Sequence, residues 1–387
     1  MIAAARVAAA IEILDVVLSG ESAEKALTHW GRTHRFAGSG DRAAIRDLVF
    51  DGLRGWRSLA ALGGSETGRG IMIGLARRSG QDLSHIFSGI GHAPAALGPS
   101  DTAASQVSDA VRADVPDWLY PTFTADLSGQ AAAVLDVMQH RAAVFLRVNL
   151  RQGTIAAAID RLAVDAIEAI PHPQVKTALQ VIANARKLQT SQAYLVGLVE
   201  LQDAASQAAV LRLPLRPGQR VLDYCAGGGG KSLAIADMAE AKVFVHDVAP
   251  HRMADLPLRA ARAGVNITSL STDALKSQLP FHLVLVDAPC SGSGTWRRTP
   301  DAKWRFGPAD LAAALDAQAE ILVQASQLVV PGGILAYATC SVLRAENQDQ
   351  VRRFLAARPD WRQVDDWQTL PSELGDGFYL GQMQRQP

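Results

Sequence analysis

The sequence predicts an α/β protein whose C-terminal part is a mostly parallel, doubly wound sheet, preceded by a small α+β unit and an all-α domain. Three observations support this prediction. After residue 209, short apolar strands alternate with helices, as in a parallel sheet that helices cover on both faces. Before it the elements are shorter, and up to residue 130 the apolar residues recur at helical spacing. We therefore expect domains at 1–130, 131–208 and 209–387.

The composition is that of an ordinary globular protein. The 387 residues are 48% hydrophobic, and 38 basic residues balance 38 acidic ones, so no global positive field indicates nucleic acid. Arg6, Glu12 and Asp15 interrupt the apolar N-terminal stretch, which predicts a helix of a soluble protein rather than a signal or membrane segment. The three cysteines have no C-x-x-C spacing, which argues against a metal site and favours a reducing, cytoplasmic setting.

The first two domains are predicted from periodicity. In the first, Ile45, Val49 and Leu53 fall at near-helical spacing between interleaved arginines, for which a solvated face is the simpler interpretation. In the second, AVFLRVNL at 143–150 reads as a strand and TIAAAIDRLA at 154–163 as a helix.

The third domain should contain five parallel strands. The segments are RVLDYCA, KVFVHDV, ITSLSTD, FHLVLVDAP and GILAYATCS, and a long helix at about 308–328 precedes the last one. In a sheet of this kind ligands bind at the carboxyl ends of the strands, where the strand order reverses. The polar residues that follow each strand are therefore the candidates for a site.

The glycine-rich loop Val221–Ser232, VLDYCAGGGGKS, fits neither of two common phosphate-binding patterns. A P-loop would need glycine at Cys225, and the dinucleotide fingerprint would need glycine at Ser232. A P-loop NTPase is therefore disfavoured. A loop without side chains still allows a ligand to lie against backbone amides.

The strand ends instead favour a nucleoside-bearing cofactor without pyrophosphate. Asp247 is suited to the two hydroxyls of a ribose, and Asp273 could accept a hydrogen bond from an adenine amino group. S-adenosylmethionine fits this description, and Lys231 with Asp223 would serve the loop or the methionine end. The predicted cofactor-binding residues are Cys225, Ala226, Gly227, Gly228, Gly229, Gly230, Lys231, Asp247, Arg252, Asp273 and Asp287.

Two thiols follow neighbouring strands. In a sheet ordered 3-2-1-4-5, Cys290 after the fourth strand and Cys340 after the fifth should meet at one edge. Both could be buried small hydrophobes, but their exits into polar loops favour a reactive thiolate, which needs an electropositive setting. The segment 296–305 after Cys290 is rich in arginine, lysine and tryptophan, and its positive charge could provide that setting. The same residue types also suit contacts with single-stranded nucleic acid. The predicted RNA-binding residues of this segment are Arg297, Arg298, Lys303 and Trp304.

These motifs resemble the RNA (cytosine-5) methyltransferases of the Sun/Nop/RsmB type. The family patterns D-x-C-A-x-x-G-G-K-S/T, D-A-P-C-S-G-x-G and T-C-S occur here at Asp223–Ser232, Asp287–Gly294 and Thr339–Ser341. A glutamine-rich element at 202–207 and R-V-N at 147–149 extend the resemblance over about 141–387. One departure is that Gly227 and Gly228 stand where the family usually has Ala-Pro.

The resemblance implies a fold and an activity. The fold is a Rossmann-like S-adenosylmethionine-dependent methyltransferase sheet after an RRM-like α+β unit, and the first domain more weakly resembles the NusB-like RNA-binding domain. The activity is methylation of cytosine C5 in RNA, with small-subunit ribosomal RNA as the expected substrate, by a monomer without a metal. Cys340 would add to C6, Cys290 would help release the product, and Asp287 would hold the base, which must be unpaired or extruded.

Other interpretations of the sequence remain open. A tRNA or DNA cytosine-5 methyltransferase would use the same cofactor, and the DNA enzymes use the Pro-Cys thiol as nucleophile, which would exchange the roles of Cys290 and Cys340. Small-molecule methyltransferases leave the helical domain unexplained. A non-catalytic RNA-binding factor for ribosome assembly, with a vestigial cofactor site, belongs to a different class of function.

Overall fold

The computed structural model describes residues 1–104, 106–278 and 280–387. It divides into two compact units, one of Met1–Arg141 with Trp296–Pro308 and one of Ala142–Thr295 with Ala309–Pro387. This division differs from the expected one because the segment 296–308 joins the helical unit. The small α+β part and the large sheet fall in one unit.

The first unit is helical, as the periodicity predicts. Leu14, Ile45 and Leu53 are fully buried in its core, and Gly74 lies so close to α4 that a Cβ would overlap the backbone oxygen of Leu59. Ser22 and Thr67 cap the helices that follow them with their side chains. The helices are α1 Ala3–Leu18, α2 Ala23–Thr33, α3 Ser39–Arg54, α4 Trp56–Gly63, α5 Gly68–Arg78, α6 Leu83–Ile86, α7 Asp109–Arg112, α8 Tyr120–Asp126, α9 Ala131–Met138 and α16 Pro300–Arg305.

The second unit begins with a small antiparallel sheet of order β2-β3-β1-β4. The predicted strand and helix are present as β1 (Val144–Val148) and α10 (Ile155–Val164). Arg147 of β1 forms a buried ion pair with Asp237, which ties this sheet to a helix of the large sheet. The remaining elements are β2 Glu168–Pro171, β3 Ala178–Ala183, α11 Gln192–Leu195 and β4 Val199–Leu201.

The large sheet has the order β10-β11-β9-β8-β5-β6-β7. Its strands are β5 Arg220–Asp223, β6 Lys242–Val245, β7 Ile267–Ser269, β8 Phe281–Asp287, β9 Val329–Thr339, β10 Trp361–Thr369 and β11 Phe378–Arg385. The first five pair in parallel in the expected order 3-2-1-4-5. The sequence interpretation did not include β10 and β11, which add to β9 as an antiparallel edge.

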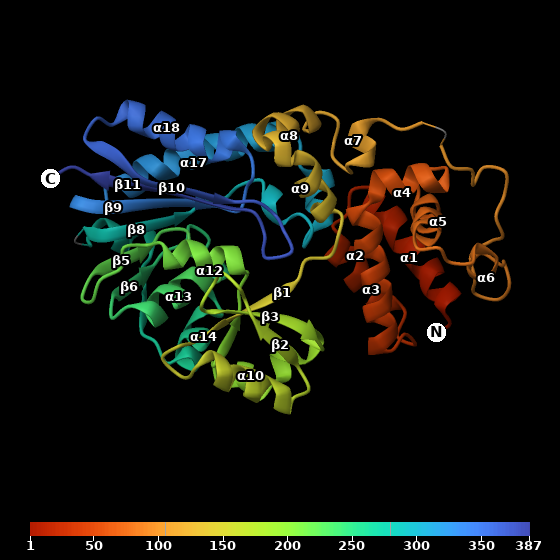
Figure 1. Ribbon diagram of the computed structural model, residues 1–387, viewed down its shortest axis with the longest axis horizontal. Coiled ribbons are helices and arrows are strands. Elements are labelled where there is room, and N and C mark those ends of the chain that lie inside the picture. Colours follow the sequence, from red (N-terminus) through yellow and green to blue (C-terminus); the bar gives the residue numbers. More distant parts are fainter. Residues whose placement is uncertain (105, 279) are drawn as a thin grey trace. The chain divides into compact units, whose positions relative to one another are not determined.

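Helices cover both faces of this sheet (Figure 1). Leu322 of α17 and Phe354 of α18 pack on one face, and Val210 of α12 and Ile235 of α13 pack on the other. The helices are α12 Ala204–Leu211, α13 Gly230–Met238, α14 Leu256–Ala263, α15 Thr272–Lys276, α17 Pro308–Ser326 and α18 Gln348–Ala357. No helix within the described ranges is both long and apolar enough to cross a membrane. The strand order reverses between β5 and β8, where a ligand site is expected.

Candidate active site

The glycine loop after β5 is held by hydrogen bonds to carboxylates. Asp223 accepts from Ser232 Oγ at 2.6 Å, and Asp247 Oδ2 accepts from the amide of Gly227 at 2.8 Å. Gly229 has a φ of +75° at the start of α13, and a Cβ there would overlap Leu256. Gly229 is therefore needed for the turn into the helix.

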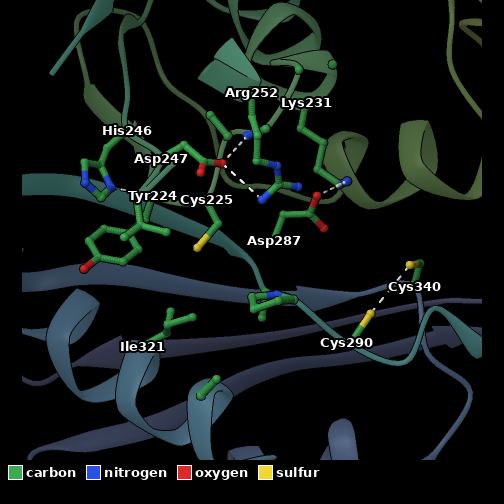
Figure 2. Close-up of a pocket in the computed structure, with 18 of the residues that line it drawn as sticks. Tyr224, Cys225, Lys231, His246, Asp247, Arg252, Asp287, Cys290, Ile321 and Cys340 are labelled. Carbon is green, nitrogen blue, oxygen red and sulfur yellow. Dashed lines mark hydrogen bonds and ion pairs between the residues drawn. The ribbon is translucent and has the colours of Figure 1, made fainter. Parts of the chain in front are cut away.

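This loop forms one wall of a cavity of about 830 Å³ in the second unit (Figure 2). Most of the predicted cofactor-binding residues line it. Its lining comprises Gln202, Ser206, Tyr224, Cys225, Ala226, Gly227, Gly228, Gly230, Lys231, His246, Asp247, Val248, Arg252, Thr272, Asp287, Ala288, Pro289, Cys290, Ala317, Glu320, Ile321, Gln324 and Cys340.

One end of the cavity suits a nucleoside. Asp247 is almost fully buried and is 3.5 Å from the guanidinium of Arg252, so its carboxylate is held in place beside the loop (Figure 2). The rings of Tyr224 and His246 lie 4.9 Å apart, and Val248, which is 86% exposed, also lines the cavity. A carboxylate for hydroxyl groups and flat or apolar surfaces for a base are thus adjacent.

Two predicted cofactor residues are not part of the lining. Asp273 lies in the first turn of α15, where its side chain is 94% exposed and pairs with Lys276. The residue before it, Thr272, lines the cavity instead. The start of the helix turns the Asp273 side chain to solvent, and its contact with adenine stays a prediction. Gly229 is likewise absent from the lining, and its role is in the turn.

The centre of the cavity contains an ion pair between Lys231 and Asp287. Lys231 Nζ lies 2.7 Å from Asp287 Oδ2, joining the start of α13 to the end of β8. Burial alone would lower the pKa of Lys231, but the Asp287 carboxylate outweighs it and raises that pKa. Lys231 is therefore a fixed positive charge at neutral pH.

The two thiols meet beside this ion pair, as the strand order predicts. Cys290 Sγ and Cys340 Sγ are 3.6 Å apart, and both residues are partly exposed (Figure 2). The hydrogen bond from Cys290 lowers the pKa of Cys340, and the charge of Lys231 acts in the same direction. The same hydrogen bond and burial raise the pKa of Cys290. These directions favour Cys340 over Cys290 as the thiolate of the pair.

The third cysteine has a different setting. Burial raises the pKa of Cys225, with further contributions from nearby carboxylates that include Asp223. A neutral thiol is a poor nucleophile, so Cys225 serves as part of the cavity wall.

The basic run after Cys290 requires a correction, because two of its predicted RNA-binding residues are buried. Arg297 and Lys303 are only 2% and 3% exposed. Lys303 Nζ donates to the backbone oxygen of Arg54 at 3.3 Å, and Trp304 Nε1 donates to that of Leu53 at 2.7 Å, so this segment packs on α3. Burial keeps the Arg297 and Lys303 side chains from phosphates. Arg298 is half-buried and stays a prediction.

Several lining residues were missed by the sequence analysis. Tyr224 and His246 stand directly beside predicted residues at the ends of β5 and β6, so their position was a usable signal. Ile321 and Gln324 belong to the long helix α17, whose cavity-facing side depends on how it packs.

The residues present fit S-adenosylmethionine. Gly227 to Gly230 leave backbone exposed to a ligand, Asp247 suits a ribose, and the Asp223 Oδ1 atom is buried without a hydrogen-bond partner among the described residues. Burial also raises the pKa of Asp223 to about 7. The sheet and this cavity together define an S-adenosylmethionine-dependent methyltransferase.

Comparisons with known proteins specify the family. Residues 210–382 match the family described as 16S rRNA methyltransferase RsmB/F, and residues 115–187 match the RsmF/B-like ferredoxin-like domain. A protein named ribosomal RNA small subunit methyltransferase B, from Sodalis glossinidius (strain morsitans), is 34% identical over 297 residues, which cover 72% of this chain and 68% of that relative. The chain therefore belongs to the RsmB/F methyltransferase family, and it spans about two thirds of the relative's length.

Solved structures agree on the fold. The crystal structure of PH0851 is 22% identical with a TM-score of 0.77, and the match covers 100% of this chain and 99% of that one. The structure of NSun6 from Pyrococcus horikoshii with SFG is 16% identical with a TM-score of 0.62, covering 70% and 98%. At these identities the likeness is one of fold. The NusB-like character of the helical unit stays a prediction.

Proposed function

We propose that this protein methylates C5 of an unpaired or extruded cytosine in ribosomal RNA of the small subunit, with Cys340 as the nucleophile. The observation that carries the proposal is the thiol pair, 3.6 Å apart, at the edge of the cofactor cavity beside Lys231 and Asp287. The ribosomal substrate is supported by the name of the Sodalis relative. We expect a cytoplasmic monomer, as the sequence suggested.

The first step uses Cys340. Carbon 5 of cytosine is a weak nucleophile, so the Cys340 thiolate adds to C6 and forms the S–C6 bond, which leaves C5 electron-rich. Asp287 binds the polar edge of the base, and N3 takes up a proton from solvent, relayed by the Asp287 carboxylate, while Lys231, 2.7 Å away, keeps its charge. Bound S-adenosylmethionine supplies the electrophilic methyl group.

The second step uses Cys290. The C5 proton leaves to solvent, its bonding electrons form the C5–C6 double bond, and the S–C6 pair returns to Cys340, while N3 returns its proton to solvent through the Asp287 carboxylate. The Cys290 thiol, in hydrogen-bond contact with Cys340, stabilises the departing thiolate. The lowered pKa of Cys340 and the raised pKa of Cys290 support this division of roles over the exchanged one of the DNA enzymes.

The test is methylation of protein-free small-subunit ribosomal RNA by the full chain with S-adenosylmethionine. Nucleoside mass spectrometry should find 5-methylcytidine, and bisulfite sequencing should place it at a defined cytosine. Methylation at another atom, or no methylation together with no cofactor binding in calorimetry, would overturn the proposal; the second result would favour a non-catalytic assembly factor.

The two thiols can be separated with the same assay. Cys340→Ala should lower the rate by at least about a thousandfold, because no adduct can form. Cys290→Ala should accumulate a covalent protein–RNA adduct, visible as a slow band on a denaturing gel. An adduct in Cys340→Ala and none in Cys290→Ala would assign the nucleophile to Cys290.

A further inference from the structure

A buried carboxylate, Glu346, lies behind the thiol pair. It belongs to the short turn Arg344–Glu346 after β9 and is 0% exposed. Its Oε1 accepts hydrogen bonds from the amide of Ser291 at 2.8 Å and from Gln318 Nε2 at 3.0 Å. Its Oε2 accepts from the hydroxyls of Ser291 and Ser341, both at 2.5 Å. Four hydrogen bonds from uncharged donors thus surround the carboxylate.

The Glu346 carboxylate is hydrogen-bonded entirely by groups that carry no charge. Transfer of a carboxylate from water to a protein interior is unfavourable unless the group is paired or fully hydrogen-bonded. These four donors satisfy its oxygen atoms, so the carboxylate is held in one position behind the thiols. A buried polar network of this kind fixes the loops that supply its donors.

The donors of Glu346 come from the two loops that carry the thiols. Ser291 follows Cys290 directly, and Ser341 follows Cys340 directly. Gln318 of α17 also donates to the backbone oxygen of Pro289, the residue before Cys290, at 2.9 Å. The carboxylate therefore connects both loops to each other and to α17.

The charges around the thiol pair are arranged asymmetrically. Lys231 favours the negative form of Cys340, whereas the negative charge of Glu346 acts on Cys290 and disfavours its ionisation. Asp287 opposes the ionisation of Cys340, and the buried hydroxyl of Tyr337 is a further titratable neighbour of Cys290. Lys231 on one side and Glu346 on the other both favour a proton on Cys290 rather than on Cys340.

We propose that Glu346 is a positioning residue that holds the two thiol loops together and directs their shared proton to Cys290. Its importance for catalysis rests on the proposed function. The effect of Glu346 on the two thiols is independent of the proposed function, because it should be present in the protein without RNA.

The test measures how fast each thiol reacts with iodoacetamide in the full chain without RNA. Peptide mass spectrometry follows the alkylation of Cys290 and Cys340 separately between pH 6 and pH 9, a range that includes the ordinary pKa of a cysteine thiol. In the wild type Cys340 should react faster at neutral pH, because the thiolate is the reactive form. Glu346→Gln keeps the size and removes the charge, so the ratio of the Cys340 rate to the Cys290 rate should fall by at least about tenfold.

Matched variants separate charge from folding. Glu346→Asp keeps the charge and should restore the ratio to within about threefold of the wild type. Ser293→Ala removes a hydroxyl of the same network, bonded to Ser341 Oγ at 3.0 Å but not to Glu346, and should leave the ratio unchanged. If Glu346→Gln does not fold, Gln318→Leu removes the link to Pro289 and should lower the ratio about threefold.

The outcomes are distinct. An unchanged ratio in folded Glu346→Gln, or in Gln318→Leu, overturns the inference, as does equal reactivity of both thiols in the wild type. A protein that shows the expected ratios but no RNA methylation contradicts the proposed function and leaves the role of Glu346 on the thiols intact.

Discussion

Two lysines with little solvent exposure, one in each unit, have opposite pKa shifts. Lys231 in the cavity has Asp287 at 2.7 Å and a raised pKa. Lys303 in the helical unit is bonded to a backbone oxygen, and burial lowers its pKa to about 8, although Asp114 acts in the opposite direction. A carboxylate in contact thus raises the pKa of a lysine that burial alone would lower. Lys231 therefore provides a positive charge beside the two thiols, whereas Lys303 contributes to the packing of the helical unit.

Among the variants that test this comparison, the largest effect should come from removing the charge of Lys231 in the cavity. Lys231→Met leaves Asp287 without its counter-charge and removes the cation that favours the Cys340 thiolate, so kcat should fall by about a hundredfold or more. The measurement is methyl transfer to ribosomal RNA at neutral pH. Lys303→Met is the control and should change kcat by less than about threefold; an equal loss in both variants would remove the distinction between the lysines.

The next effect concerns stability and its pH dependence. The folded pKa of Lys303 is about 8 and the unfolded value is 10.5, so between these pH values the unfolded state binds more protons and stability rises with pH. Relative to Lys303→Met, the wild type should gain about 2 kcal/mol in the free energy of unfolding from pH 7 to pH 10. Urea unfolding followed by tryptophan fluorescence is suitable, because five of the seven tryptophans lie in the helical unit.

Lys303→Met also tests the correction to the RNA-binding residues. Because the side chain is buried, RNA affinity at neutral pH should change by less than about twofold. A tenfold loss of affinity with unchanged stability would restore Lys303 as an RNA contact.

A smaller effect is expected for two aspartates of the cofactor domain. Asp247→Asn removes the charge that the loop amide of Gly227 and Arg252 contact, so cofactor affinity measured by calorimetry should fall about tenfold. Asp273→Asn is the matched variant and should have no measurable effect, because that side chain is exposed. Equal losses in both would indicate that Asp273 turns toward the ligand when it binds.

The smallest effect should come from the loop itself. Gly227 has a φ of +52°, which costs about 1 kcal/mol for a residue with a Cβ. Gly227→Ala should therefore weaken cofactor binding about fivefold. Unchanged affinity would show that the loop can adopt a conformation that accepts alanine, the residue that the family usually has there, at position 227 without a free-energy cost.

The site was largely predictable from the sequence because it is built from strand ends. Cys290 and Cys340 could be placed together from strand order alone, and Asp247 and the glycine loop followed from the same topology. The alternation of apolar strands with helices identifies a doubly wound sheet, and the expected strand order follows from that fold class.

The parts that could not be predicted depend on packing between distant segments. A run of arginine, lysine and tryptophan has the same composition whether it is exposed or covered, so the burial of Arg297 and Lys303 on α3 left no local signal. The direction of the Asp273 side chain depends on where α15 begins, and the cavity-facing side of α17 depends on its docking.

The helical unit is discontinuous in sequence, and this limits how the chain can be divided. Three aromatic residues of the segment 296–308 pack on aromatic residues of the helical unit: Trp296 on Phe123, Trp304 on Trp56 and Phe306 on Trp118. This segment therefore belongs to the helical unit although it lies between two parts of the catalytic unit in the sequence. A truncation that removes residues 1–141 would leave these aromatic side chains exposed to water and prone to aggregation. Independent expression of the catalytic part would therefore require replacing residues 296–308 with a short polar linker.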